Sequence, residues 1–169
     1  MRAATARAVY RSRQLFGSLR PRIDGERRAR ALALLTPPKR RLFEAMTPRD
    51  QAHCLAVYER LCAQGHTDKE LTVAALLHDA GKGRIALWHR VAYVLLAARA
   101  PGLLRRFARP GDGPSWREAL YRCWRHPQLG AELARRAGCS DAVVTLIEAN
   151  ENGGGDQRLA ALLAADDAV

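Results

Sequence analysis

A nearly unbroken apolar segment, residues 71–77, is followed directly by two ionisable residues, His78 and Asp79. A helix formed there is apolar on almost every side, so it should lie at the centre of the fold. The preceding residues Thr67-Asp68-Lys69-Glu70 have the pattern of a capping box, and Gly81 predicts a C-terminal cap. A buried helix that ends in an ionisable pair predicts a site for a polar ligand at that end, because unpaired buried charge is costly.

The composition favours an all-helical protein. Ala, Leu and Arg dominate, whereas aromatic residues make up only 6%, so strong helix formers greatly outnumber strand formers. A chain of 169 residues is the usual size of one domain. We therefore predict an all-α, single-domain helical bundle, with residues 1–40 as a basic N-terminal extension containing a short helix and residues 41–169 as the helical domain.

Caps and helix breakers predict the remaining elements. Thr36-Pro37-Pro38 and Pro101 are expected to end helices, and His126-Pro127 is expected to start a new one. Loops are expected at 110–114 and 150–155, and no segment alternates long enough to indicate a sheet. Besides the central helix, the expected helices cover residues 24–35, 48–62, 85–99, a segment through Trp116 and Trp124, 126–137, a segment opened by Ser140 and Asp141, and 156–167.

The net charge of +11 is concentrated near the N-terminus. Residues 1–41 contain twelve Lys or Arg and two acidic residues, a charge of +10, so the other 128 residues carry only +1. Two interpretations stay open for this segment. It is either a solvated lead-in or an electrostatic arm for nucleic acid or an acidic surface.

The cysteines and the apolar pattern indicate a cytoplasmic protein. No C-x-x-C pair occurs among Cys54, Cys62, Cys123 and Cys139, so neither a zinc knuckle nor a disulfide framework is expected. Arginines interrupt every short apolar run at the N-terminus, which disfavours a signal peptide. No uncharged apolar stretch is long enough to predict a transmembrane segment.

Three histidines and two aspartates occur where helices would turn polar groups inward: His53, His78, His126, Asp79 and Asp166. Imidazole nitrogens and carboxylate oxygens suit divalent metals such as Mn, Fe, Co, Ni, Mg or Zn. Adjacent residues inside a straight helix point about 100° apart, whereas at a helix end they can face one ion. Helices that converge on an ion are a common way to build a metal site in a bundle.

These residues resemble those of the HD-domain superfamily of metal-dependent phosphohydrolases. The resemblance covers roughly residues 40–169, and its most specific part is the string Leu76-Leu77-His78-Asp79-Ala80-Gly81-Lys82. It implies an HD-type bundle whose metal ligands are His53, His78, Asp79 and Asp166. Asp167 is the competing candidate for the last ligand, since spacing does not decide between the two aspartates.

A second similarity is to the HD-GYP branch, whose H-P-x-x-G segment matches His126-Pro127-x-x-Gly130. In that branch the histidine serves a second metal, and the lysine matched by Lys82 contacts the substrate phosphate. The match then ends, because residues 149–153 read Ala-Asn-Glu-Asn-Gly where that branch has two further histidines. The resemblance therefore implies one metal, or an asymmetric pair with a weak second site.

Together the residues and the resemblance lead to a functional hypothesis. The protein is expected to hydrolyse a phosphate ester, such as that of a nucleotide, with Asp79 and Lys82 as catalytic residues. Lys82, Arg84 and His126 are expected to contact the substrate. The alternative is a non-catalytic regulatory protein of the same fold that binds a nucleotide or a protein partner.

Overall fold

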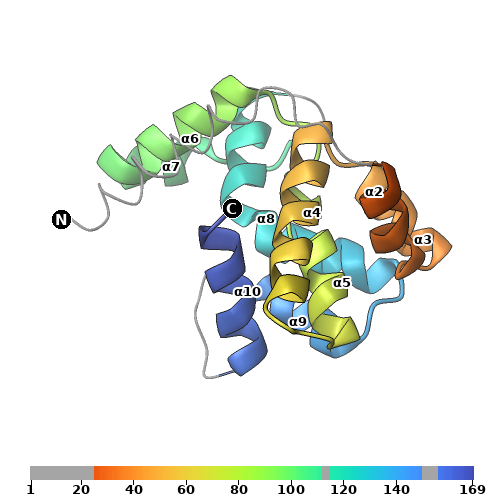
Figure 1. Ribbon diagram of the computed structural model, residues 1–169. Helices are drawn as coiled ribbons and strands as arrows, with labels where there is room; N and C mark the ends of the chain where they lie inside the picture. The colour runs from red at the N-terminus through yellow and green to blue at the C-terminus, as the bar shows by residue number, and fades with distance from the viewer. Residues whose placement is uncertain (1–24, 112–114, 150–155) are drawn as a thin grey trace.

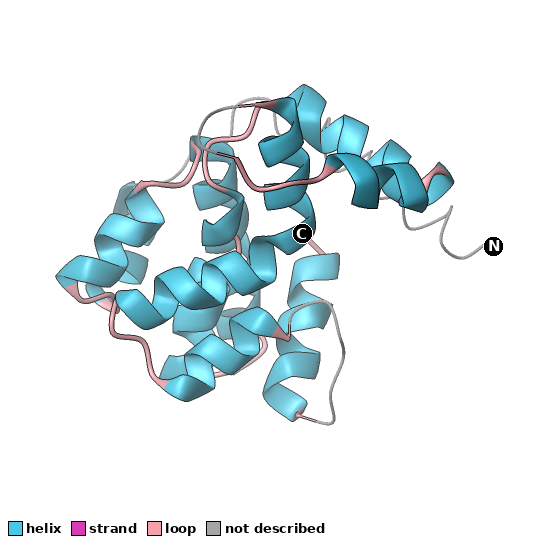
Figure 2. Cartoon of the chain, turned by 180° about the vertical axis from the view of Figure 1, so that it is seen from behind, coloured by secondary structure: helices cyan, strands magenta, loops and turns pink. Residues whose placement is uncertain are grey.

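The computed structural model describes residues 25–111, 115–149 and 156–169, and every regular element in these ranges is helical (Figures 1 and 2). The prediction of an all-α protein is therefore confirmed for the described residues. The elements are α2 (Gly25–Ala33), α3 (Pro37–Glu44), α4 (Pro48–Ala63), α5 (Lys69–Leu77), the short 3-10 helix η1 (Ala80–Lys82), α6 (Leu87–Arg99), α7 (Pro101–Phe107), α8 (Trp116–Arg136), α9 (Asp141–Glu148) and α10 (Gln157–Asp167).

Helix α5 is the centre of the bundle, as its apolar sequence predicts. Every residue from Leu71 to Leu77 is buried, and α3, α4, α9 and α10 all contact this helix. The turn between α4 and α5 contains Gly65 at φ +85°, a backbone conformation that favours glycine. The short turn lets α4 fold back along α5. The end of α5 is thus enclosed by segments distant in the sequence.

Two details of the predicted start and end of α5 were wrong. The N-cap is Asp68 rather than Thr67, and its carboxylate accepts hydrogen bonds from the amides of Glu70 and Leu71. Gly81 does not cap the helix, because α5 ends at Leu77 and Gly81 lies within η1. Asp68 is the better cap because its carboxylate oxygen reaches both amides at once.

Gly81 is instead required by close packing against α8. A Cβ atom at Gly81 would collide with the carbonyl oxygen of His126 and the amide nitrogen of Gly130. At Gly130 a Cβ would lie 3.2 Å from an Ile147 methyl group and 3.4 Å from the Gly81 nitrogen. The two glycines therefore allow η1 to cross α8 backbone to backbone, which brings the segment after α5 against the middle of α8.

The helix ends expected at Pro37 and Pro101 are confirmed, since α2 ends at Ala33 and α6 ends at Arg99. Each proline also begins the next helix, α3 or α7, where a missing amide hydrogen costs nothing. Pro127 does not begin a helix, because α8 runs unbroken from Trp116 to Arg136 through it. Helix α8 continues because another group hydrogen-bonds the carbonyl that Pro127 leaves free, as described below.

Helix α2 and the turn after it join the same core as the rest of the bundle, since Ala31, Leu32 and Leu35 are buried with α5. The domain boundary expected at residue 40 stays a prediction. The expected basic arm falls largely on residues 1–24, and the expected turn on residues 150–155; both segments lie outside the described residues. Among the described helices, none is long and apolar enough to cross a membrane.

Candidate metal centre

His78 lies at the end of α5 and is almost completely buried, with 1% of its side chain exposed. Its Nδ1 atom is 2.9 Å from the carbonyl oxygen of Ala75. A carbonyl oxygen only accepts, so Nδ1 carries the hydrogen and the neutral ring has its lone pair on Nε2. Nε2 is buried without a hydrogen-bond partner among the described residues. A buried polar atom without a partner needs an explanation, and a ligand bound at His78 Nε2 would supply one.

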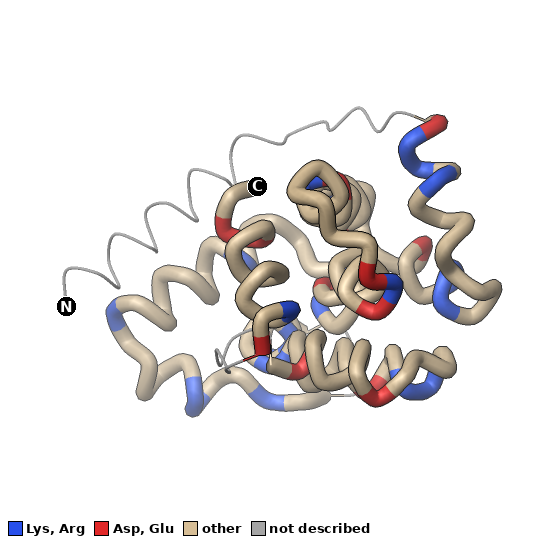
Figure 3. The backbone as a smooth tube through the Cα atoms, turned by 60° about the horizontal axis from the view of Figure 1, so that its bottom comes forward, with Lys and Arg blue, Asp and Glu red and all other residues tan. Residues whose placement is uncertain are grey.

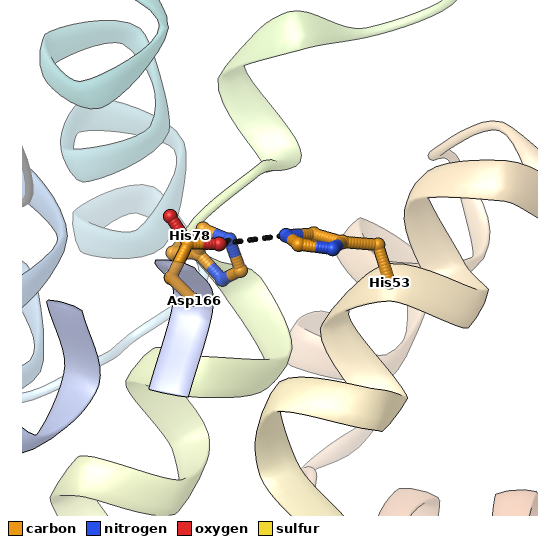
Figure 4. A group of neighbouring side chains, drawn as sticks. All are labelled: His53, His78 and Asp166. Carbon is orange, nitrogen blue, oxygen red and sulfur yellow. Dashed lines mark hydrogen bonds and ion pairs between the residues drawn. The ribbon is translucent and has the colours of Figure 1, made fainter. Parts of the chain in front are cut away.

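His53 and Asp166 approach the same point from α4 and α10 (Figure 4). His53 Nε2 donates a hydrogen bond of 2.7 Å to Asp166 Oδ1, and His78 Nε2 lies 3.4 Å from the same oxygen. The His53 and His78 rings meet edge to face, with centroids 5.4 Å apart. One ligand atom from each residue lies within 4.8 Å of the other two. Three predicted ligands, 113 positions apart at the extremes, therefore converge.

Asp79 borders this triplet on the side of η1. Its Oδ1 atom lies 3.5 Å from His78 Nε2, and Lys82 Nζ lies 2.6 Å from both carboxylate oxygens. Asp79 forms a second triplet, buried throughout, with His78 and Cys54. His78 thus belongs to both groups. The four predicted ligands form two overlapping clusters around one imidazole rather than one symmetric set.

His126 faces Asp79 from α8, with its Nε2 3.9 Å from Asp79 Oδ1. Its Nδ1 donates to the carbonyl oxygen of Cys123 at 2.9 Å. In an unbroken helix that carbonyl would accept from the amide of residue 127, and Pro127 has no amide hydrogen. The proline therefore frees the oxygen that orients His126. The lone pair on Nε2 of the neutral ring is directed to the Asp79 side.

Electrostatics keep a negative field around His78. Burial by itself would raise the pKa of Asp79, but Lys82 and the surrounding histidines lower it far below its usual value. Burial would likewise raise the pKa of Asp166, but the hydrogen bond to His53 and the nearby imidazole of His78 lower it instead. Both carboxylates are therefore charged at neutral pH. A pair of anionic carboxylates beside imidazole nitrogens is a donor set that favours a cation.

His78 and His126 differ in whether their surroundings raise or lower the pKa of the imidazole. Burial would lower the pKa of His78, but contact with Cys54, Asp79 and Asp166 raises it well above the usual value. Burial and the nearby Lys82 charge instead lower the pKa of His126 to about 4. His126 is thus neutral at pH 7 and can offer its Nε2 lone pair. His78 sits where positive charge is most favoured.

A second buried pair lies beside this cluster. The Asp50 carboxylate receives two hydrogen bonds from the Arg90 guanidinium, at 2.7 and 2.6 Å, and one from the Thr47 hydroxyl at 2.7 Å. The pair joins the first turn of α4 to α6. Asp50 also raises the pKa of Lys82, after Asp79, against the lowering effect of burial. Lys82 is therefore bound by Asp79, and the charge of Asp50 also favours its protonated form.

The predicted site residues do not all take part. Asp166 joins the cluster, whereas Asp167, the alternative ligand, is exposed. Arg84 is exposed on the loop after η1 and belongs to neither triplet. Lys82 and His126, by contrast, both lie beside the Asp79 carboxylate.

Sequence reasoning overlooked Cys54, Asp50 and Arg90. Cys54 Sγ lies 3.7 Å from His78 Nδ1, and the helical spacing of Asp50 and His53 places them on one face of α4. This spacing is the feature of the sequence from which Asp50 and its neighbours could have been identified as part of the site. No comparable signal identifies Arg90, because its partner is 40 positions away.

Comparison of the chain with protein-family models, with curated proteins and with solved structures finds no match. The site is therefore interpreted from its own geometry. The donor set fits a divalent ion, because imidazole nitrogens and anionic carboxylates meet at a buried nitrogen without a hydrogen-bond partner.

Proposed function

We propose that the protein is a metal-dependent phosphohydrolase of the HD-domain kind, acting on a phosphate ester such as a nucleotide in the cytoplasm. One observation carries the proposal: His53, His78 and Asp166, from three separate elements, bring their ligand atoms together beside Asp79. Structural polar clusters usually satisfy their own hydrogen bonds, whereas here a buried imidazole nitrogen has none. A binding role explains this better than a structural one.

His53, His78 and Asp166 would hold the ion, with Asp79 completing the ligands from the η1 side. A divalent ion bound there would lower the pKa of a water molecule and polarise a phosphoryl oxygen. The Ala75 carbonyl fixes the His78 ring, so its Nε2 stays directed at the site without rearrangement. Burial of His78 and Asp79 excludes bulk water from the inner side, which strengthens every charge interaction there.

Lys82 and His126 would act on the substrate. The Lys82 side chain is 24% exposed, and its ammonium lies against the buried carboxylate of Asp79. From that position it can neutralise a phosphate oxygen while remaining charged. His126 is neutral and can accept a proton or a hydrogen bond at Nε2. Asp79 lies beside both groups, because its carboxylate binds Lys82 Nζ at 2.6 Å and its Oδ1 lies 3.9 Å from His126 Nε2.

Metal binding is the first test. The chain should be purified, stripped with a chelator, and titrated separately with Mn²⁺, Fe²⁺ and Zn²⁺, with the bound metal counted by elemental analysis. We expect near-stoichiometric metal in the wild type and a loss of affinity of at least about tenfold in His78→Ala. His66→Ala, which changes an imidazole outside both triplets, is the matched control. Substoichiometric metal under all conditions would contradict the proposal.

Turnover is the second test. Generic phosphomonoester and phosphodiester substrates, followed by a panel of nucleotides, should be assayed with wild type, Asp79→Ala and Lys82→Ala. Metal-dependent hydrolysis should fall by about a hundredfold or more in Asp79→Ala. A protein that binds metal but turns over none of these substrates would favour the alternative, a non-catalytic regulator that binds a nucleotide or a protein partner.

A further inference from the structure

Helix α6 is apolar in sequence, yet it buries no residue completely. Its inner face, with Ala92, Tyr93 and Leu96, packs against a small cluster on α7 and α8. Helices α6 and α7 together project from the main bundle in both views (Figures 1 and 2). We call residues 87–109 the α6–α7 arm. An apolar helix with so little burial is unusual in a small domain and indicates that its outer face serves another purpose.

The outer face of the arm carries large apolar side chains. Trp88 is 61% exposed, Leu95 49% and Leu103 47%. Trp88 and Leu95 are seven positions apart and therefore share one face of α6. Trp116, at the start of α8 and 43% exposed, packs edge to face on Phe107 of α7. Four of the five large hydrophobic side chains found exposed in the described residues thus lie on the arm or at its base.

The arm is also free of acidic residues. Between Asp79 and Asp112 the sequence has seven Lys or Arg and no Asp or Glu, and the arm in Figure 3 shows no acidic position. Because residues 42–169 as a whole carry +1, the part of that segment outside residues 80–111 carries −6. Positive charge is therefore concentrated where the apolar side chains are exposed. The exposed arginines of the arm are Arg99, Arg105, Arg106 and Arg109.

We propose that the α6–α7 arm docks the protein on a membrane surface rich in anionic lipid. Exposed tryptophan, leucine and arginine side chains on one projecting arm suit the boundary between head groups and acyl chains. The Arg117 guanidinium lies 5.3 Å from the Trp116 ring centroid, so this pair can enter that boundary together. Anionic head groups would neutralise the arginines while the acyl region takes up Trp88 and Leu95.

Charge complementarity favours lipid over the other occupants of this face. A second copy of the chain that packed arm against arm would bring two acid-free, basic segments together, and like charges repel. A nucleic acid would match the arginines but would leave Trp88, Leu95 and Leu103 without an apolar environment. An anionic lipid surface is the partner that satisfies both the charge and the apolar side chains. This inference does not depend on the proposed hydrolase activity.

Vesicle co-sedimentation with the full chain tests the proposal. Vesicles of phosphatidylcholine mixed with phosphatidylglycerol should bind the protein, and vesicles of phosphatidylcholine alone should bind it far more weakly. The double variant Trp88→Ser/Leu95→Ser should lose at least about tenfold in affinity. Leu34→Ser, which changes an exposed leucine next to α2, is the matched control and should bind as the wild type does. Circular dichroism verifies that each variant is folded.

The charge contribution is tested separately. Arg105→Ala and Arg106→Ala should each weaken binding to the anionic vesicles about fivefold, whereas Arg135→Ala and Arg136→Ala at the end of α8 should not. Binding should also fall as salt rises. Equal binding by wild type and Trp88→Ser/Leu95→Ser would overturn the proposal and assign the binding to the basic residues near the N-terminus. A dimer that dissociates in that variant, or binding to nucleic acid without binding to vesicles, would overturn it as well.

Discussion

Asp50 is a buried carboxylate whose charge is balanced mainly by Arg90, and only 3% and 12% of the two side chains are exposed. Asp50→Ala would leave the guanidinium buried without its partner. We expect a loss of about 3 kcal/mol in the free energy of unfolding, measured by urea denaturation. Glu132→Ala, which removes an exposed partner of Arg135 and Arg136, should leave it nearly unchanged. Equal effects would mean that the Asp50 pair is not structurally important.

The four thiols should differ strongly in reactivity. Burial raises the pKa of the Cys123 thiol to about 11, so roughly one molecule in a thousand carries the reactive thiolate there at pH 8. Burial raises the pKa of Cys54 as well, whereas Cys62 is exposed. Alkylation with iodoacetamide at pH 8, followed by peptide mass spectrometry, should modify Cys62 first. Rapid modification of Cys54 or Cys123 would indicate that the bundle opens readily at the site.

At the scale of elements, the crossing of η1 and α8 is the most constrained contact. Gly81→Ala would drive a methyl group into the α8 backbone, so it should destabilise the protein by more than about 2 kcal/mol. Gly102→Ala in α7, where a methyl group meets nothing within 4 Å, should instead stabilise it by about 0.5–1 kcal/mol. Thermal unfolding followed by circular dichroism distinguishes the two variants. A tolerated Gly81→Ala would mean that η1 can move away from α8.

Helices α5 and α8 show which features of an element the sequence can predict. Local chemistry was sufficient to predict that α5 exists and is buried, because its apolar residues act within the helix itself, but it was not sufficient for the caps of α5. It was insufficient at Pro127, because the helix continues only when His126 turns its ring back to the Cys123 carbonyl. That hydrogen bond depends on which rotamer the ring adopts, and the bundle decides the rotamer. A proline in the sequence therefore predicts the end of one helix and the start of another equally well.

For the whole molecule, bound metal should stabilise the folded state. A ligand that binds only the native chain adds about 2.7 kcal/mol at a free concentration a hundred times its dissociation constant. We expect the unfolding midpoint to rise when Mn²⁺ or Zn²⁺ is added, and to return when a chelator removes it. The rise should vanish in Asp166→Asn but persist in Asp167→Asn, because only the first carboxylate faces His53 and His78. Equal behaviour of the two variants would contradict the assigned ligands.

The candidate site was largely visible in the sequence, since His53, His78, Asp79 and Asp166 were all predicted and lie together. Their residue types and helix-end positions are local information. The choice between Asp166 and Asp167 was not available, because it depends on the rotation of α10 against α4. The pairing of Asp50 with Arg90 could not be predicted for a similar reason. The position of α6 relative to α4 depends on the direction that the chain takes through η1 after α5.

The close approach of Gly81 and Gly130 has a consequence for the search for related chains. A Cβ atom at Gly81 would run into the α8 backbone, and one at Gly130 would press on an Ile147 methyl group 3.2 Å away, so neither position accepts a larger residue unless its neighbours shift. Chains that share this crossing should therefore keep both glycines, together with the imidazoles three and four positions before them. Paired retention of these four positions would be a better guide to distant kinship than overall identity.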